Sequence, residues 1–291
     1  MDRERGVHSM KKYLGNWRGK FFLIAPTMIL ITVMVLYPMF VLVVHSFTQW
    51  DGLNPAKFNG ISNYIRLFKD PIFYTGLKNG LIFAALQACI QIPIATVLAF
   101  AVKHSGKIAA VLSITVVSQL WLSMYNADNG LINKLFEVLG ISYRQNWLGD
   151  EHAAIIAIAM VNIWQFTGYQ FILLLSAANS IPDHYFEAAR IDGCTKMQAH
   201  IKITMPLMQE TYKYCLIIAI TGGLNAFASM NIMTGGGPGT ATYTLTYLMY
   251  RSAFKIGNYG YGCTSAVMLV VQCLIVSIII NRLVARERIV Y

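Results

Sequence analysis

The residues best suited to a chemical task lie in one polar segment, from Glu187 to Gly193, with Pro206 thirteen residues after that glycine. Glu187 carries a carboxylate that an arginine side chain can bind through two parallel hydrogen bonds. Ala188 and Ala189 follow it and leave a shallow surface that another protein can approach closely. These residue types therefore predict recognition of a partner protein.

The residues around this segment predict a helical insert at about 180–208. Ser180 offers a capping hydroxyl, and Pro182 falls near the first helical position, where a missing N–H does no harm. Gly193 can supply the left-handed backbone at which helices commonly end. A second short helix, predicted from about residue 195 to 202, should stop before the proline that follows it.

An amphipathic helix lying flat on lipid is the alternative for the insert. Such a helix carries Lys and Arg on one face and bulky apolar residues on the other. The first helix of the insert instead has Asp183, Glu187 and Asp192 against a single Arg190. Because the inner leaflet is anionic and repels acidic groups, docking with a partner protein is favoured.

The elements that must position this insert are membrane spans. Hydrophobic residues make up 56% of the 291 residues and charged residues only 12%, about half the charged fraction usual in soluble domains. Runs of about twenty apolar residues are needed to cross a bilayer, and they must be helices there. Six stretches qualify, at about residues 21–47, 77–102, 108–127, 153–178, 212–233 and 262–281. The sequence therefore predicts an all-α membrane protein: a basic tail, residues 1–20, and a six-span transmembrane domain, residues 21–291, with the insert between spans four and five.

The distribution of lysine and arginine predicts how the spans are oriented. A cleaved signal peptide is the alternative for the first stretch, but its apolar run is too long and no small-residue cleavage site follows. With the N-terminus inside, the inside segments hold fifteen lysines and arginines and the outside segments hold eight. Since cytoplasmic loops are enriched in these residues, both termini and the insert are expected in the cytoplasm. The net charge of +10 is then a signal of topology and of contact with anionic lipid, and nothing indicates nucleic-acid binding.

Polar residues recur inside three of the predicted spans. Such side chains are costly against lipid, so they should face the protein interior or a wet cavity. Hydrogen bonds between helices explain each residue almost as well, but polar stripes on three spans together favour an internal path. The candidates for that path are Gln87, Gln91, Asn162, Trp164, Gln165, Tyr169, Asn225 and Ser229.

A sharp turn is predicted after the fifth span, at Gly235, Gly236, Gly237 and Pro238, because these residues cannot continue a helix. The turn is not a phosphate-binding loop, since no Gly-Lys-Ser/Thr ends it, and the chain has no other such motif for ATP.

The five cysteines are odd in number and show no metal-ligand spacing, so neither disulfides nor a metal site is expected.

The insert closely resembles the docking loop of permease subunits of ATP-binding-cassette importers. The matching residues are Glu187, Ala188, Ala189, Asp192, Gly193 and Pro206. Further segments resemble the maltose and multiple-sugar type, namely Gly60–Tyr64, Gly130–Asn133, Trp147–Leu148 and Gly235–Pro238 followed by Thr240, Tyr250 and Phe254. The resemblance runs from about Ala25 to Ala285. Two departures are mild: Cys194 replaces a small residue, and Met205 stands where leucine often precedes the proline.

This resemblance implies a division of labour in a bacterial or archaeal cytoplasmic membrane. A second permease subunit, expected to be a paralogue, completes the path. Two cytoplasmic ATPase subunits bind ATP, so this chain would hold no cofactor and would not be an enzyme. An extracellular or periplasmic solute-binding protein delivers a sugar. The loop from Glu187 to Gly193, with Pro206, would sit in a groove of one ATPase and move with it.

Two other classes of function are less well supported. An ion-coupled carrier needs an intramembrane carboxylate or histidine, and the predicted spans offer only edge positions such as His45. A membrane enzyme would need a motif such as HExxH or paired carboxylates at span ends, and the sequence has neither. For an importer, the solute stays open among mono-, di- and oligosaccharides, sugar acids and glycerol phosphate.

Overall fold

Helices form nearly all of the regular structure in the computed structural model, which describes residues 17–101 and 114–283. Within these ranges, five helices are long and apolar enough to cross a membrane: Lys20–Ser46, Pro71–Ala101, Ala153–Asn179, Gln209–Met233 and Tyr259–Arg282. They agree with five of the six predicted spans. The third predicted span, 108–127, corresponds to the shorter apolar helix α7 (Ile114–Met124), and its first residues, like most of the predicted basic tail, lie outside the described ranges.

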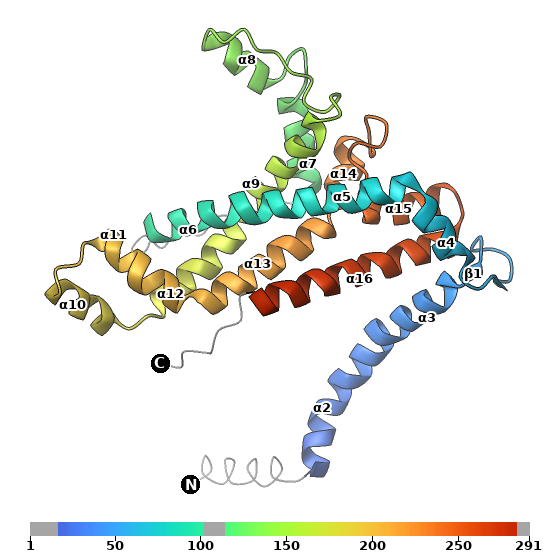
Figure 1. Ribbon diagram of the computed structural model, residues 1–291, viewed down its shortest axis with the longest axis horizontal. Coiled ribbons are helices and arrows are strands. Elements are labelled where there is room, and N and C mark those ends of the chain that lie inside the picture. The colour runs from blue at the N-terminus through green and yellow to red at the C-terminus, as the bar shows by residue number, and fades with distance from the viewer. Residues whose placement is uncertain (1–16, 102–113, 284–291) are drawn as a thin grey trace.

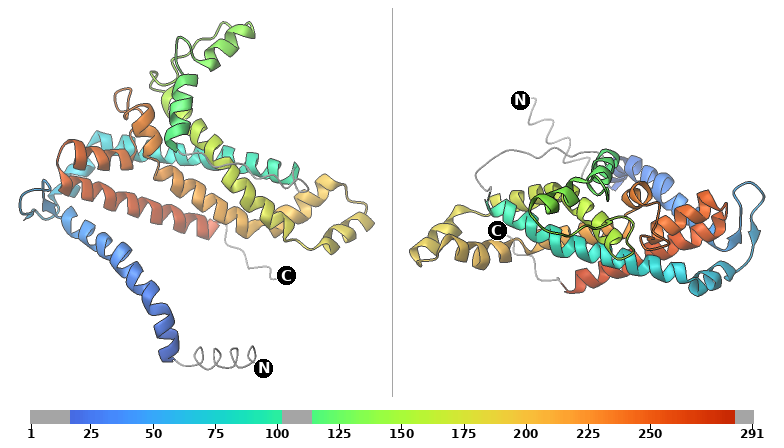
Figure 2. Two further views of the ribbon diagram at one scale, coloured as in Figure 1. Left: turned by 180° about the vertical axis from the view of Figure 1, so that it is seen from behind. Right: turned by 90° about the horizontal axis from the view of Figure 1, so that it is seen from above.

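Four long helices lie side by side and form the body of the molecule (Figures 1 and 2). Their elements are α5 (Pro71–Leu86), the π-helical turn η2 (Gln87–Gln91), α6 (Ile92–Ala101), α9 (Ala153–Asn179), α13 (Gln209–Leu224) and α16 (Tyr259–Leu283). Ala95 and Ala99 of α6 are fully buried in a cluster with Leu174 of α9. Small side chains at these positions let the two helices approach closely, which is how membrane helices commonly associate.

The two ends of this body carry different connections (Figure 1). At one end lies the insert, with α10 (Asp183–Ile191), α11 (Lys196–Ala199), the π-helical turn η3 (His200–Thr204) and α12 (Met205–Leu207). At the other end lie the paired strands β1 (Thr48–Gln49) and β2 (Lys57–Phe58), α4 (Ser62–Lys69), α15 (Leu245–Tyr250) and the π-helical turn η4 (Arg251–Lys255). We call these ends the insert end and the α4 end.

The first span diverges from the body (Figure 1). It consists of α2 (Trp17–Ile31), the π-helical turn η1 (Thr32–Leu36) and α3 (Tyr37–Ser46). The wide turn ends just before Pro38, whose ring would clash with a carbonyl in a regular helix. Its second half, α3, packs against α16, and its end is fixed to the body: the backbone oxygen of Ser46 accepts hydrogen bonds from Asn63 Nδ2 and Thr264 Oγ1, each 3.0 Å long.

The fifth span is broken, although one continuous helix is predicted at 212–233. The helix α13 ends at Leu224, and the short helix α14 (Ala228–Met233) follows after three residues. Gly222 and Gly223 weaken the helix before the break. The Asn225 side chain also donates to the Thr221 backbone oxygen at 2.8 Å, as asparagine does where it competes with helical hydrogen bonding.

Candidate functional site

The first helix of the insert, α10, ends at a glycine with a left-handed backbone. Gly193 has a φ of +76°. Its N–H donates to the Arg190 oxygen at 3.1 Å, and the next N–H, that of Cys194, reaches back to the Ala189 oxygen at 2.9 Å. This pair of bonds satisfies carbonyls that the helix end would leave free. The closed end fixes where the chain turns toward the second helix.

The start of α10 differs from the prediction. The Ser180 hydroxyl donates to the Ala177 oxygen at 2.8 Å, so it belongs to the end of α9 and does not cap α10. The helix begins at Asp183, and Pro182 lies directly before it in an extended conformation, near the first helical position as predicted. Proline suits this place because it donates no N–H and its ψ of 142° directs the chain into the helix.

The second helix of the insert begins at a capping box. The Thr195 hydroxyl accepts the Gln198 N–H, and the Gln198 side chain accepts the Thr195 N–H in return. The predicted stop before Pro206 is wrong, because helical structure continues through α11, η3 and α12 to Leu207. Pro206 falls in the first turn of α12, directly after a wide π-helical turn. A proline with no N–H is tolerated at that position.

The exposed surface of α10 combines a carboxylate with apolar groups. Glu187, Ala188 and Asp192 are exposed, whereas Ala189 is buried and only 6% accessible, so it cannot form part of the surface predicted for both alanines. Ile191 is 87% exposed and lies four residues after Glu187, on the same side of the helix. Sequence reasoning missed this isoleucine; its place in an otherwise polar helix was the available signal.

The insert is anchored to the body at its base. The His200 ring stacks on the Phe100 ring of α6, with centroids 4.6 Å apart and planes 11° apart. Phe186 packs against the apolar cluster formed by α6, α9 and α13. A pocket of about 360 Å³ remains between the end of α6 and the insert, lined in part by Asp183, Arg190 and Lys196. A force on the insert would therefore reach α6 and α9 directly.

The candidate path residues do not gather at one place inside this chain. Gln87, Gln91, Asn162 and Ser229 are buried within the body. Gln87 and Gln91 lie on the wide turn η2, a type of turn often found at functional sites. Asn162 donates to the Ile158 oxygen of its own helix at 3.2 Å, as a packing residue would.

The remaining path candidates lie nearer the surface of the chain. Trp164 is 51% exposed and Tyr169 is 45% exposed, both on α9, where Gln165 is half-buried. Asn225 is exposed at the break in the fifth span, and its Nδ2 lies 3.6 Å from Cys273 Sγ of α16. Exposed polar and aromatic groups of this kind can serve a path only if another subunit covers them.

The turn after α14 is stabilised by two threonine side chains that were not among the residues predicted for it. Gly235 and Gly236 have φ values of +59° and +88°, and the Gly237–Pro238 peptide is cis. The Thr242 hydroxyl lies 2.7 Å from the Thr234 hydroxyl and donates to the Gly237 oxygen at 2.9 Å. These hydrogen bonds give the turn a defined conformation.

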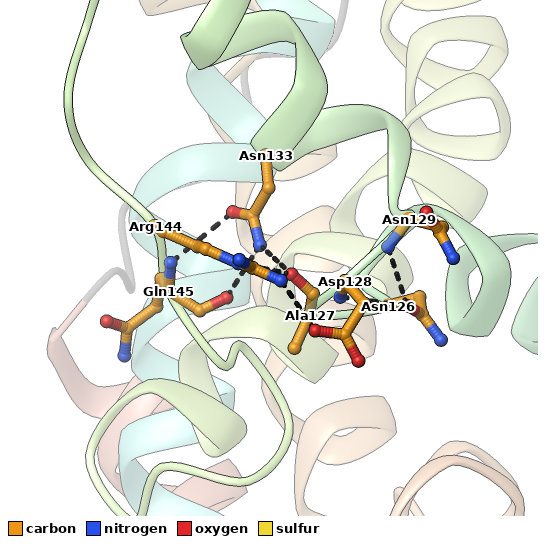
Figure 3. Close-up of polar contacts among 7 residues, drawn as sticks. All are labelled: Asn126, Ala127, Asp128, Asn129, Asn133, Arg144 and Gln145. Carbon is orange, nitrogen blue, oxygen red and sulfur yellow. Dashed lines mark hydrogen bonds and ion pairs between the residues drawn. The ribbon is translucent and has the colours of Figure 1, made fainter.

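A second ordered projection surrounds α8 (Leu131–Val138), between α7 and α9. The buried Asn133 side chain is its centre: Nδ2 donates to the Ala127 and Gln145 oxygens at 3.1 and 2.9 Å (Figure 3). The Arg144 guanidinium donates to the same Ala127 oxygen and pairs with Asp128 at 2.5 Å (Figure 3).

Among the described residues there is no group of three His, Cys, Asp or Glu side chains that could hold a metal ion.

Comparison with known proteins gives similarity along nearly the whole chain. A protein-family profile described as binding-protein-dependent transport system inner membrane component matches residues 13–289. The probable ABC transporter permease protein YurN of Bacillus subtilis is 33% identical over 258 residues, covering 84% of this chain and 88% of that protein. The multiple sugar-binding transport system permease protein MsmF of Streptococcus mutans is 33% identical over 283 residues, covering 93% and 96%. The lactose transport system permease protein LacF of Rhizobium radiobacter is 31% identical over 294 residues, covering 96% and 97%.

Solved structures share the fold. A chain of a bacterial ABC transporter involved in import of the acidic polysaccharide alginate superposes with a TM-score of 0.77 at 21% identity, covering 95% of this chain and 98% of that chain. A chain of the alginate transporter in complex with an alginate pentasaccharide-bound periplasmic protein gives 0.79 at 21% identity, covering 96% and 97%. The helical arrangement described above is thus that of a known membrane fold.

Proposed function

This chain belongs to the family of binding-protein-dependent transport system inner membrane components, and on that premise we propose that it forms half of the translocation path of an ATP-driven carbohydrate importer. The observation that carries the proposal is near full-length similarity to permeases named for lactose and for multiple sugars. The family is one of transport permeases, and we infer a transport role for this chain and no catalytic one. A permease for a related solute such as glycerol phosphate is the alternative.

The proposed assembly contains this chain, a paralogous permease mate, two cytoplasmic ATPase subunits and an external solute-binding protein. The chain is a multi-pass membrane protein, and we place both termini and the insert in the cytoplasm on the lysine and arginine distribution. ATP is bound by the ATPase subunits, with no cofactor on this chain. The insert end and the α4 end of the body then face the two sides of the membrane, one toward the ATPase and the other toward the binding protein.

The insert transmits motion in this proposal. Glu187 would pair with an arginine of the ATPase, while Ala188 and Ile191 would fill its groove, since all three are exposed on α10. The stack of His200 on Phe100 supports transfer of movement into α6. ATP and the loaded binding protein would favour an outward-open state, and hydrolysis would return the inward-open one, because each ligand binds one state more tightly.

The path would run past Trp164, Tyr169 and Asn225, which are exposed in this chain and would be covered by the mate. Aromatic rings and amides suit the ring faces and hydroxyls of a sugar. Gln87 and Gln91 would lie beside the path within the body, on a π-helical turn of the kind often found at functional sites. Ser229 and Asn162 are buried polar residues inside the body.

The test is uptake of a radiolabelled sugar panel, with glycerol phosphate included, by the complete importer in proteoliposomes. Glu187→Lys should reduce co-purification of the ATPase by at least about tenfold, because it replaces an attraction with a repulsion. Glu137→Lys, at an exposed site on α8, is the matched charge-reversal control and should leave ATPase binding unchanged.

Three outcomes would contradict the proposal. They are full ATPase binding and uptake by the Glu187→Lys variant, uptake of no member of the panel by the intact complex, and uptake by this chain alone without ATP. The last outcome would favour an ion-coupled carrier.

A further inference from the structure

The break in the fifth span leaves a backbone carbonyl without a helical partner. Between Leu224 and Ala228 the chain is not helical, and Phe227 has φ and ψ of −128° and −53°. The carbonyl of Ala226 lies in this gap, half-buried in an apolar cluster. A buried carbonyl that is not hydrogen-bonded is costly, so its partners decide whether the break is stable.

Two threonine hydroxyls, from α15 and its cap, lie within hydrogen-bonding distance of this carbonyl. Thr246 Oγ1 lies 2.8 Å from the Ala226 oxygen, and Thr244 Oγ1 lies 3.1 Å from it. The two hydroxyl oxygens are 2.8 Å apart, and Thr244 accepts the N–H of Tyr247 at 3.3 Å. Because each hydroxyl has one proton, a continuous donor chain can run from the Tyr247 N–H through Thr244 and Thr246 to Ala226.

The segment that carries these hydroxyls is itself fixed to α5. Asn79 Nδ2 donates to the Ala241 and Tyr243 oxygens at 2.8 and 3.0 Å. At Gly76, an added Cβ would lie 3.1 Å from the Thr244 carbonyl carbon, so α5 approaches this backbone closely. Both threonines are buried. The hydroxyls therefore have a rigid support from which to hold the break.

We propose that Thr244 and Thr246 are positioning residues that hold the break in the fifth span open and so place Asn225 for contact with the transported solute. The proposal rests on the proposed function for the role of Asn225, but the geometric part stands on the described contacts alone. Without the hydroxyls, the Ala226 carbonyl would lose its donors, and the span would gain by closing into a continuous helix. Asn225 would then rotate away from Cys273, its neighbour on α16.

A cysteine pair can report this geometry. Asn225→Cys places a thiol beside the native Cys273, in a chain whose other accessible cysteines, Cys89, Cys194 and Cys263, are replaced by alanine. Cross-linking by copper phenanthroline or a short bifunctional thiol reagent should be rapid in membranes containing the assembled importer. Thr244→Val with Thr246→Val should slow it by about tenfold, the order expected when a half-buried carbonyl loses its hydrogen-bond donors.

Two further variants separate the hydroxyl effect from general damage. Thr246→Ser keeps a donor and should cross-link like the parent. Thr242→Val removes an equally buried hydroxyl in the same segment, one that bonds Gly237 and not Ala226, and it should also cross-link like the parent. All variants are compared at equal amounts of ATPase-bound complex, which shows that they have folded and assembled.

The second arm measures sugar uptake by the same threonine variants with Asn225 retained. We expect the double valine variant to lose about tenfold in maximal uptake rate, the Thr242 variant to stay near the parent, and Thr246→Ser to restore uptake. Unchanged cross-linking in the double valine variant overturns the proposal, and so does slowed cross-linking with full uptake. Failure of the parent itself to transport any sugar would instead contradict the proposed function.

Discussion

Single residues decide how the insert is shaped, and Gly193 shows this most directly. No atom lies within 4 Å of a Cβ added there, so space is not the constraint. The constraint is the φ of +76°, which side chains with a branched Cβ rarely adopt.

Gly193→Val should therefore open the end of α10 at a cost of roughly 1–2 kcal/mol or more, with loss of ATPase binding. Gly193→Asn is the matched variant, because asparagine tolerates this backbone, and it should retain most of the binding. Co-purification of the ATPase measures both. Equal binding by the valine and asparagine variants would show that backbone handedness is not what matters at this position.

Asp150 is a second residue that shapes its local backbone, and its effect depends on the protonation state of its carboxyl group. Its carboxylate accepts the N–H groups of His152 and Ala153 at 2.9 and 2.8 Å, at the start of α9. These hydrogen bonds lower the pKa of Asp150 below its ordinary value. A lowered folded-state pKa means that the stabilisation is present above the unfolded pKa and is lost as pH falls through the folded value.

We expect amide hydrogen exchange in the first turn of α9 to quicken when the pH falls from neutrality to about 3, after correction for the intrinsic rate. Asp150→Asn, which cannot titrate, should abolish this pH dependence while keeping an acceptor for the two N–H groups. If the asparagine variant shows the same pH dependence as the parent, the carboxylate is not its source.

At the scale of elements, helix packing depends on which of two adjacent glycines faces a neighbour. A Cβ on Gly223 would lie 2.7 Å from the Ala84 Cα of α5 and 2.7 Å from Gln87 Oε1. A Cβ on Gly222 would meet nothing within 4 Å. Both glycines lie in α13, but within this chain Gly223 lies against α5 and Gly222 has no close neighbour.

Gly223→Ala should therefore separate α13 from α5 and destabilise the chain by roughly 1–3 kcal/mol. Gly222→Ala should be neutral or slightly stabilising, because alanine favours helix over glycine. Thermal unfolding of the purified complex, followed by thiol-reactive dye, compares the two variants. Equal loss of stability in both would mean that close contact with α5 is not the reason for the glycine at 223.

The sequence predicted elements better than their interruptions. Apolar runs place the long spans, since a bilayer demands them regardless of the neighbours. The break at 225–227 could not be predicted in the same way, because the hydroxyls that stabilise it come from Thr244 and Thr246, which are distant in sequence. Likewise, the burial of Ala189 depends on how α10 packs, whereas the preference of Gly193 for a left-handed backbone is intrinsic to glycine.

At the scale of the whole molecule, the body is well packed but the first span is not. None of the most apolar window of Lys20–Ser46 is buried by the rest of the described chain. If a permease mate covers part of it, the chain made alone should be cleaved faster by protease in membranes than the chain made with its mate. Equal cleavage rates would mean that lipid alone protects this helix from the protease.

The first span is held to the body through α3, at the α4 end, and this has a mechanical consequence. A helix that is held through one half can swing at its other half, α2, without straining the body, so the packing of the remaining helices would not depend on where α2 lies. In the proposed importer, such a helix would stay in contact with the permease mate while the interface between the two subunits opens and closes.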